Sequence, residues 1–113
     1  MTPGEIGLVS LPQVGGGAAK LRPALLLAIL PGPYQNLLLC GISTQVHAMV
    51  PNWDEQLDTN DADFILSGLR QSSLIRLSYL YAAGAGEIVG IIGSIDPARL
   101  DRILNRLARH LHL

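Results

Sequence analysis

The chain has few of the residues that build disulfide-linked, aromatic-rich or membrane-spanning proteins. Its 113 residues include one cysteine, Cys40, which excludes a disulfide within the chain and, in an apolar run, indicates a buried thiol. Aromatic residues make up only 4% and charged residues 15%. The longest apolar runs, such as residues 24–30, are too short to span a bilayer. No basic stretch followed by an apolar one begins the chain, so we expect no signal peptide, no membrane partner and a cytoplasmic location.

An excess of charge of one sign is also missing. The net charge of -1 gives no nucleic-acid signal, but the distribution is uneven. Five of the nine acids lie in one stretch: Asp54, Glu55, Asp58, Asp61 and Asp63. Outside that stretch eight bases face four acids, so the rest of the chain can offer phosphates a positive surface. We interpret the acidic stretch as a solvated loop, because it lacks the spacing of a calcium-binding EF-hand.

Hydrophobic residues, in contrast, make up 49% of the chain. The length allows one domain, covering residues 1–113. A domain of this size buries a smaller share of its surface than a large one does, so this is more apolar material than its core needs. We therefore expect part of the apolar surface to lie in a subunit interface, which predicts a homodimer.

Short apolar runs bounded by glycine and proline predict buried β-strands. They cover residues 6–11, 24–30, 37–42, 73–80 and 87–95. In the fourth run, alternation puts Leu77 and Tyr79 on the same face. In the fifth, Gly90 and Gly93 suggest a bulge or a close backbone approach. Residues 50–67 have no clean period, and we expect an irregular excursion with one helical turn.

The last segment predicts an amphipathic helix over residues 97–111. Asp96 is a good N-cap, and Pro97 suits the first helical position. Apolar residues recur at helical spacing on one side of this helix. The other side carries Arg99, Arg102, Arg106 and Arg109, which we interpret as solvated. Core strands within residues 4–95 and this helix predict a mainly β (α+β) fold, a small curved sheet or barrel of about five to seven short strands.

Several short motifs follow one another in order along the chain. They are Gly4-Glu5, the glycine-rich residues 15–20, Arg22-Pro23-Ala24, Ile42-Ser43-Thr44-Gln45, Gly68-Leu69 and Leu74-Ile75-Arg76-Leu77. Their order, with the final strand, turn and helix, resembles the MazF/PemK family of toxin endoribonucleases. The resemblance covers nearly the whole chain and implies an SH3-like barrel.

The resemblance implies the toxin of a type II toxin–antitoxin system, a growth inhibitor that acts as a homodimer. Such an enzyme is a metal-independent endoribonuclease that cleaves single-stranded RNA or mRNA. The RNA 2′-OH attacks its own phosphate and leaves a 2′,3′-cyclic phosphate and a 5′-OH end. The resemblance therefore implies no metal and no cofactor. Its implied partners are the RNA and a cognate antitoxin with an acidic, disordered tail.

The resemblance also assigns residues. Arg22, whose guanidinium can grip two phosphate oxygens, and Ser43, at the position of a catalytic threonine, are the implied catalytic residues. The implied RNA-binding residues are Lys20, Pro23, Thr44, Gln45 and Arg76. Gly15, Gly16 and Gly17 would form a flap. Lys20, Arg22, Arg70 and Arg76 are the only bases outside the final helix, and we expect them to serve RNA phosphates and antitoxin carboxylates alike.

Two other interpretations remain open. One is a non-catalytic SH3-like barrel that binds protein or nucleic acid, including a CcdB-like gyrase inhibitor; the other is an unrelated structural barrel. The first loop lacks the acidic or hydroxyl residue of many relatives, which favours binding alone, whereas Arg22 and Ser43 favour cutting. The aromatic residues Tyr34, Trp53 and Tyr79 could stack bases, but we expect them to pack in the core or at an interface.

Overall fold

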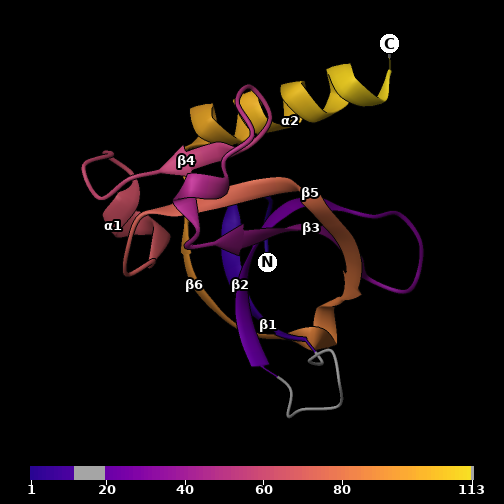
Figure 1. The fold of residues 1–113 in the computed structure, drawn as a ribbon. Coiled ribbons are helices and arrows are strands. Elements are labelled where there is room, and N and C mark those ends of the chain that lie inside the picture. The colour runs from indigo at the N-terminus through magenta and orange to yellow at the C-terminus, as the bar shows by residue number, and fades with distance from the viewer. Residues whose placement is uncertain (12–19, 113) are drawn as a thin grey trace.

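The computed structural model describes residues 1–11 and 20–112. Within them the chain forms six strands and two α-helices, so the mainly β prediction is confirmed (Figure 1). The strands are β1 Glu5–Leu11, β2 Lys20–Ile29, β3 Asn36–Ser43, β4 Glu55–Leu57, β5 Ser73–Gly84 and β6 Ile88–Ser94. The helices are α1 Phe64–Ser67 and α2 Pro97–Leu111, with 3-10 turns η1 Val46–Ala48 and η2 Ala85–Glu87. No described helix has the length and hydropathy needed to cross a membrane.

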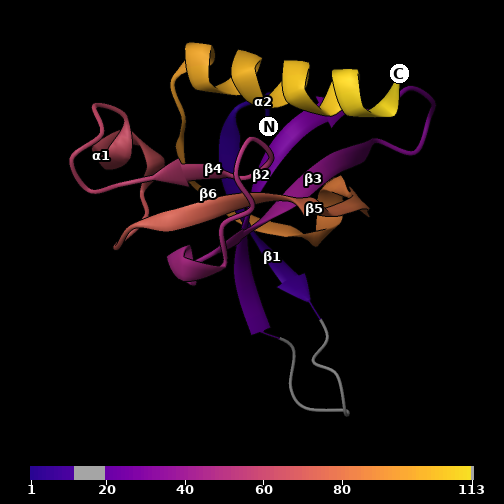
Figure 2. The ribbon, with the colours of Figure 1, turned by 45° about the horizontal axis from the view of Figure 1, so that its top comes forward.

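The strands form one antiparallel sheet in the order β4-β5-β3-β2-β1-β6. The sheet curls strongly, and α2 lies across one of its faces (Figures 1 and 2). Among the described residues no pairing joins the edge strands β4 and β6, so the predicted barrel is an open, curled sheet. The segment that follows β4, including α1, packs against β6 instead.

Two glycines make this contact between α1 and β6 possible. A Cβ at Gly93 would lie 2.1 Å from the backbone oxygen of Leu66, and a Cβ at Gly68 would lie 2.1 Å from that of Ile92. Gly68 also has a φ of 72°, which side-chain-bearing residues rarely adopt. The register of β6 against β1 also shifts at two places. Both parts of the prediction for this strand, bulge and close approach, are confirmed.

Both faces of the sheet are apolar, which explains the leucine-rich runs of the sequence. Along β2, Leu25 and Leu27 belong to one buried cluster, and Leu26 belongs to another. The first cluster includes Ile103 of α2, whose predicted N-cap Asp96 accepts a hydrogen bond from the Ala98 N–H at 2.8 Å. A sheet buried on both sides needs continuous apolar runs rather than alternation.

Cys40 lies in β3, an interior strand of this sheet, and its side chain is fully buried. Burial raises the pKa of its thiol to about 12, with a smaller contribution from the charge of Asp54. The prediction of a buried thiol is confirmed. A thiol that stays protonated is a poor nucleophile, so Cys40 is a packing residue.

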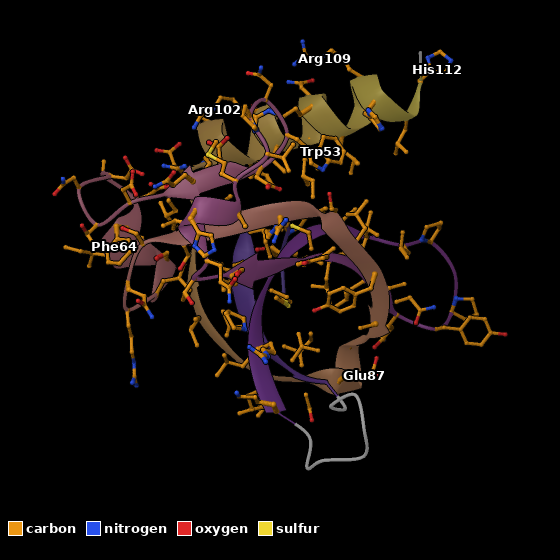
Figure 3. All side chains as sticks on the ribbon, in the orientation of Figure 1. Trp53, Phe64, Glu87, Arg102, Arg109 and His112 are labelled. Carbon is orange, nitrogen blue, oxygen red and sulfur yellow. The ribbon has the colours of Figure 1, made fainter. Side chains whose placement is uncertain are left out.

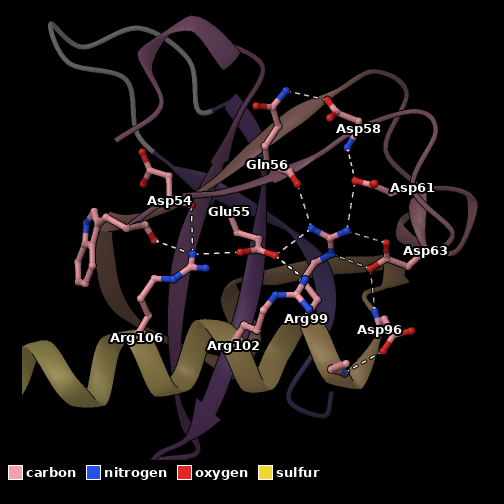
Figure 4. A network of polar contacts seen from close by, with 12 residues as sticks. Asp54, Glu55, Gln56, Asp58, Asp61, Asp63, Asp96, Arg99, Arg102 and Arg106 are labelled. Atoms are coloured by element: carbon pink, nitrogen blue, oxygen red, sulfur yellow. Dashed lines mark hydrogen bonds and ion pairs between the residues drawn. The ribbon is translucent and has the colours of Figure 1, made fainter. Parts of the chain in front are cut away.

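The acidic stretch is not a solvated loop, and this interpretation is wrong. Asp54, Glu55 and Asp63 are buried. Part of the stretch forms β4, which pairs with β5 and lies beside the polar side of α2 (Figure 4). The acids and the helix arginines are oppositely charged and separated by about forty residues of sequence, so neither segment alone reveals that they meet.

The arginine side of α2 is therefore not solvated as a whole either. Arg99 is buried and lies 2.9 Å from Asp63 and 3.1 Å from Glu55. Arg102 and Arg106 also reach Glu55, at 2.7 and 3.0 Å. Arg109 fits the prediction, because it is exposed (Figure 3) and bonds to its own helix, and Arg102 remains 53% exposed although it reaches Glu55. We call the ion pairs that Arg99, Arg102 and Arg106 make with Glu55 and Asp63 the Arg99 network.

Candidate functional site

Arg22 and Ser43 meet in one pocket at the ends of β2 and β3. Ala24 pairs with Gly41 across these antiparallel strands, and the same register, extended toward the strand ends, sets Arg22 opposite Ser43. Both residues line a pocket of about 730 Å³. The β2–β3 pairing therefore brings together the two residues that the resemblance identifies as catalytic.

Three of the five predicted RNA-binding residues also line the pocket: Pro23, Thr44 and Gln45. Lys20 and Arg76 do not. Lys20 is exposed and, because successive strand side chains alternate, it lies on the same face of β2 as Arg22. The predicted flap residues Gly15, Gly16 and Gly17 lie outside the described residues.

Ser43 is the last residue of β3, and its hydroxyl has a structural partner. Its Oγ accepts a hydrogen bond from the Gln45 N–H at 3.1 Å. A hydroxyl that accepts one bond still has its own proton to donate, so the turn fixes Ser43 without consuming its donor. Because the strand ends here, the alternation of side chains ends as well, and Thr44 lines the same pocket.

The pocket also takes residues that the motif comparison did not assign to the site. Arg70 and Gln71 come from the segment between α1 and β5, Ser73 is the first residue of β5, and Tyr79 and Tyr81 lie further along that strand. Two of these residues had a signal in the sequence: Arg70 as one of the few bases outside the final helix, and Tyr79 as an aromatic side chain that could stack bases. The tyrosines and Gln71 belong to no motif, and only folding places them beside Arg22.

The charge and donor groups of this pocket suit an anionic ligand. Its charged lining residues, within the described part of the chain, are Arg22 and Arg70, with no carboxylate among them. Burial raises the pKa of the Tyr81 phenol, with smaller contributions from Cys40 and Glu87. Tyr81 therefore remains a neutral hydrogen-bond donor at neutral pH. Guanidinium and hydroxyl groups are common hydrogen-bond donors to phosphate oxygens in proteins, and this pocket offers both.

Arg76 lies beside the pocket rather than in it. Its Nε is 3.7 Å from a carboxylate oxygen of the buried Asp54, and its side chain is only 15% exposed. Its guanidinium carbon also lies 4.7 Å from the centre of the Tyr79 ring. The described contacts of Arg76 are thus with the protein itself.

Solved structures share this fold over nearly the whole chain, although no protein-family model and no curated protein sequence matches it. One is the Mycobacterium tuberculosis toxin MazF-mt6, with a TM-score of 0.69 and 18% identity over 96% of this chain and 97% of that one. The chain has a MazF-like toxin fold.

A second structure with the MazF-like fold is described as an endoribonuclease in complex with its cognate antitoxin from Mycobacterial species. It aligns with a TM-score of 0.62 and 17% identity over 100% of this chain and 96% of that one. At such identities the comparison establishes the fold that the motif order predicted, and the chemistry must be argued from the pocket.

Proposed function

We propose that this chain is the toxin of a toxin–antitoxin pair and an endoribonuclease that cuts single-stranded RNA. The observation that carries the proposal is that Arg22 and Ser43 line one pocket, whose charged lining among the described residues is positive. The MazF-like fold supports it, since one neighbour is a toxin and another is described as an endoribonuclease.

The proposed reaction is an attack of the RNA 2′-OH on its neighbouring phosphate. The products are a 2′,3′-cyclic phosphate and a 5′-OH end. Because the nucleophile belongs to the substrate, holding the phosphate in position supplies much of the rate. Arg22 would grip two phosphate oxygens, and the Ser43 hydroxyl would donate to one of them as negative charge develops.

The bond between O2′ and phosphorus forms as the bond between phosphorus and O5′ breaks, and the 2′-OH loses a proton while the 5′ oxygen gains one. Histidine and carboxylate side chains, the usual general bases near neutral pH, do not line the pocket within the described residues. Stabilisation of phosphorane charge by Arg22, Arg70 and the hydroxyl donors would therefore dominate. The second arginine also offers a contact for a flanking phosphate of the same strand.

The first test is cleavage in the presence of excess EDTA. Single-stranded RNA incubated with the purified chain should be cut without divalent metal, and the new ends should be 5′-OH and 2′,3′-cyclic phosphate. Ser43→Ala purified in the same way should cut at least about tenfold more slowly, which excludes a contaminating nuclease. Cleavage that requires added metal or leaves 5′-phosphates would contradict the mechanism. Binding of RNA without cleavage would support the non-catalytic alternative.

We also propose that the chain is a homodimer, because large apolar side chains are exposed on α1 and β6. Ile65 is 89% and Val89 62% exposed, and these two elements pack against each other. Light scattering at micromolar concentration should give twice the 12.1 kDa chain mass. Ile65→Lys and Val89→Lys should weaken the dimer, whereas Leu111→Lys, on a residue 72% exposed at the end of α2, should not. A wild-type monomer would contradict the proposal.

An antitoxin is the natural partner of such a toxin. One neighbour with this fold is described in complex with its cognate antitoxin. The bases that we expected to act together do not all lie in the pocket. Arg22 and Arg70 line it, whereas Arg76 forms an ion pair with Asp54. We therefore propose that an acidic antitoxin tail would compete with RNA at Arg22 and Arg70, and that salt would weaken both complexes.

A further inference from the structure

Tyr79 is an aromatic side chain of the pocket that the proposed cleavage chemistry does not use. It lines the same pocket as Arg22 and Ser43, and it is 54% exposed. Most aromatic side chains in proteins bury their rings for packing. A ring left half-exposed inside a cationic pocket has a face available to a flat ligand.

A bulge in β5 places the Tyr79 ring in the pocket. Cys40 of β3 pairs with Leu80, but the next residue, Gly41, pairs with Arg76, so residues 77–79 have no partner across the strands. Leu77 stays in the core at 1% exposure while Tyr79 turns outward. The expected alternation, with both on one face, is wrong because the bulge breaks the period of the strand.

Two contacts with Arg76 hold the ring in place. The Arg76 guanidinium carbon lies over it, 4.7 Å from its centre, and Arg76 Nη1 donates to the Tyr79 hydroxyl at 3.4 Å. The buried Asp54 carboxylate, 3.7 Å from Arg76 Nε, anchors the arginine in turn. The glycine at position 41 leaves room for this side chain, since a Cβ there would lie only 3.2 Å from that of Tyr79. A ring fixed before binding loses little conformational entropy when a ligand arrives.

We propose that Tyr79 is a stacking platform for one base of the single-stranded RNA whose phosphate Arg22 holds. The inference rests on the proposed function and specifies how that site grips its substrate. Arg76 covers one side of the ring and leaves the other for the base, so Arg76 is a positioning residue. Leu8, Leu69 and Ile92 give the same pocket an apolar lining that suits a nucleobase. Because every base has a π face, Tyr79 contributes affinity rather than sequence choice.

Binding of a short, fluorescein-labelled, single-stranded oligodeoxynucleotide of mixed sequence tests the platform. This probe lacks the 2′-OH and cannot be cut by the proposed route. Tyr79→Leu, which keeps apolar bulk but removes the ring, should bind it about tenfold more weakly, whereas Tyr79→Phe should bind within about twofold of wild type. Tyr34→Leu is the matched control, because Tyr34 is 79% exposed and does not line the pocket. Equal thermal melting of all three variants shows that the fold is intact.

A spectroscopic signature separates stacking from mere support. Trp53 is the only tryptophan, so wild type supplies the background for Tyr79→Trp. The added fluorescence should be quenched when the probe binds. Unchanged fluorescence, or wild-type probe binding by Tyr79→Leu, would overturn the platform even if the wild type cuts RNA. If the wild type binds the probe through Tyr79 but cuts no RNA, the platform stands and the proposed nuclease activity fails.

Discussion

Replacing Arg22 with alanine should lower RNA cleavage by about a hundredfold or more and leave the fold unchanged. Arg22 is exposed at the start of β2, and its side chain makes no hydrogen bond or ion pair with the other described residues. Its removal therefore costs no internal contact there. The loss falls on the transition state, where the phosphate gains charge that a guanidinium fork can stabilise. Single-turnover cleavage of a defined RNA measures the effect directly.

Two further variants make this experiment specific. Arg22→Lys keeps the charge but loses the planar fork, so its rate should lie between those of wild type and Arg22→Ala. Arg109→Ala removes an exposed arginine of the same charge from the far end of α2 and should cut RNA like the wild type. If Arg109→Ala proved as damaging as Arg22→Ala, the RNA would lie along the helix and not in the pocket between β2 and β3.

The largest effect on stability is expected at Arg99. Arg99→Met should lower the free energy of unfolding by about 3–5 kcal/mol, because it leaves the buried Asp63 carboxylate without its cation, whereas Glu55 keeps Arg102 and Arg106. Arg99 donates to Asp63 through Nε at 2.9 Å and to Glu55 through Nη1 at 3.1 Å. Urea unfolding followed by circular dichroism measures the change. Arg109→Met, an exposed arginine of the same helix, should change stability by no more than about 0.5 kcal/mol.

The Arg99 network also gives a pH dependence. Burial by itself raises the pKa of Asp63, but hydrogen bonds from Arg99 and from the Asp96 N–H outweigh it, and the pKa in the folded chain is lowered. A carboxyl whose pKa is lower when folded stabilises the fold above its unfolded pKa, near 4. That contribution is lost as the pH falls through the folded value. The wild type should therefore lose stability below about pH 4 more steeply than Arg99→Met does.

A cost below about 1 kcal/mol for Arg99→Met would contradict this account. It would mean that the carboxylate of Asp63 stays hydrated in the variant, as carboxylates are in exposed ion pairs. The double variant Arg99→Met with Asp63→Asn provides a second check. Removing one stranded charge should recover part of the lost stability, since a buried carboxylate without a partner is the main cost.

The sequence predicted those parts of the fold that have local causes. Asp96 and Pro97 begin a helix wherever they precede a helical apolar period, and α2 spans the expected residues. What could not be predicted depends on segments that meet only after folding. The strand β4 is short, and its burial follows from arginines on α2 far along the chain. The bulge that turns Tyr79 outward could not be predicted either, because the sequence of β5 alternates as it would in a regular strand.

In the candidate site, too, some residues could be predicted from local motifs and others depend on how the chain folds. Arg22 and Ser43 belong to ordered motifs, and pairing of β2 with β3 brings them together. Gln71 and Tyr81 reach the pocket from other segments, through the path of the chain after α1, and nothing near them in the sequence indicates that destination. Arg76 belongs to a motif, yet its contacts are with Asp54 and Tyr79, because a nearby buried carboxylate holds its guanidinium.

The rate at which the single thiol of this chain reacts can measure how fast the protein unfolds. Cys40 is sealed between β2 and β5 in the interior of the sheet, so a thiol-trapping reagent can reach it only when the sheet opens. When the reagent labels the open state faster than the sheet recloses, the labelling rate equals the opening rate of the molecule. A protease meets the same barrier, since it too must wait for the chain to open. The labelling rate of the Cys40 sulfur would thus report how long the folded protein resists proteolysis.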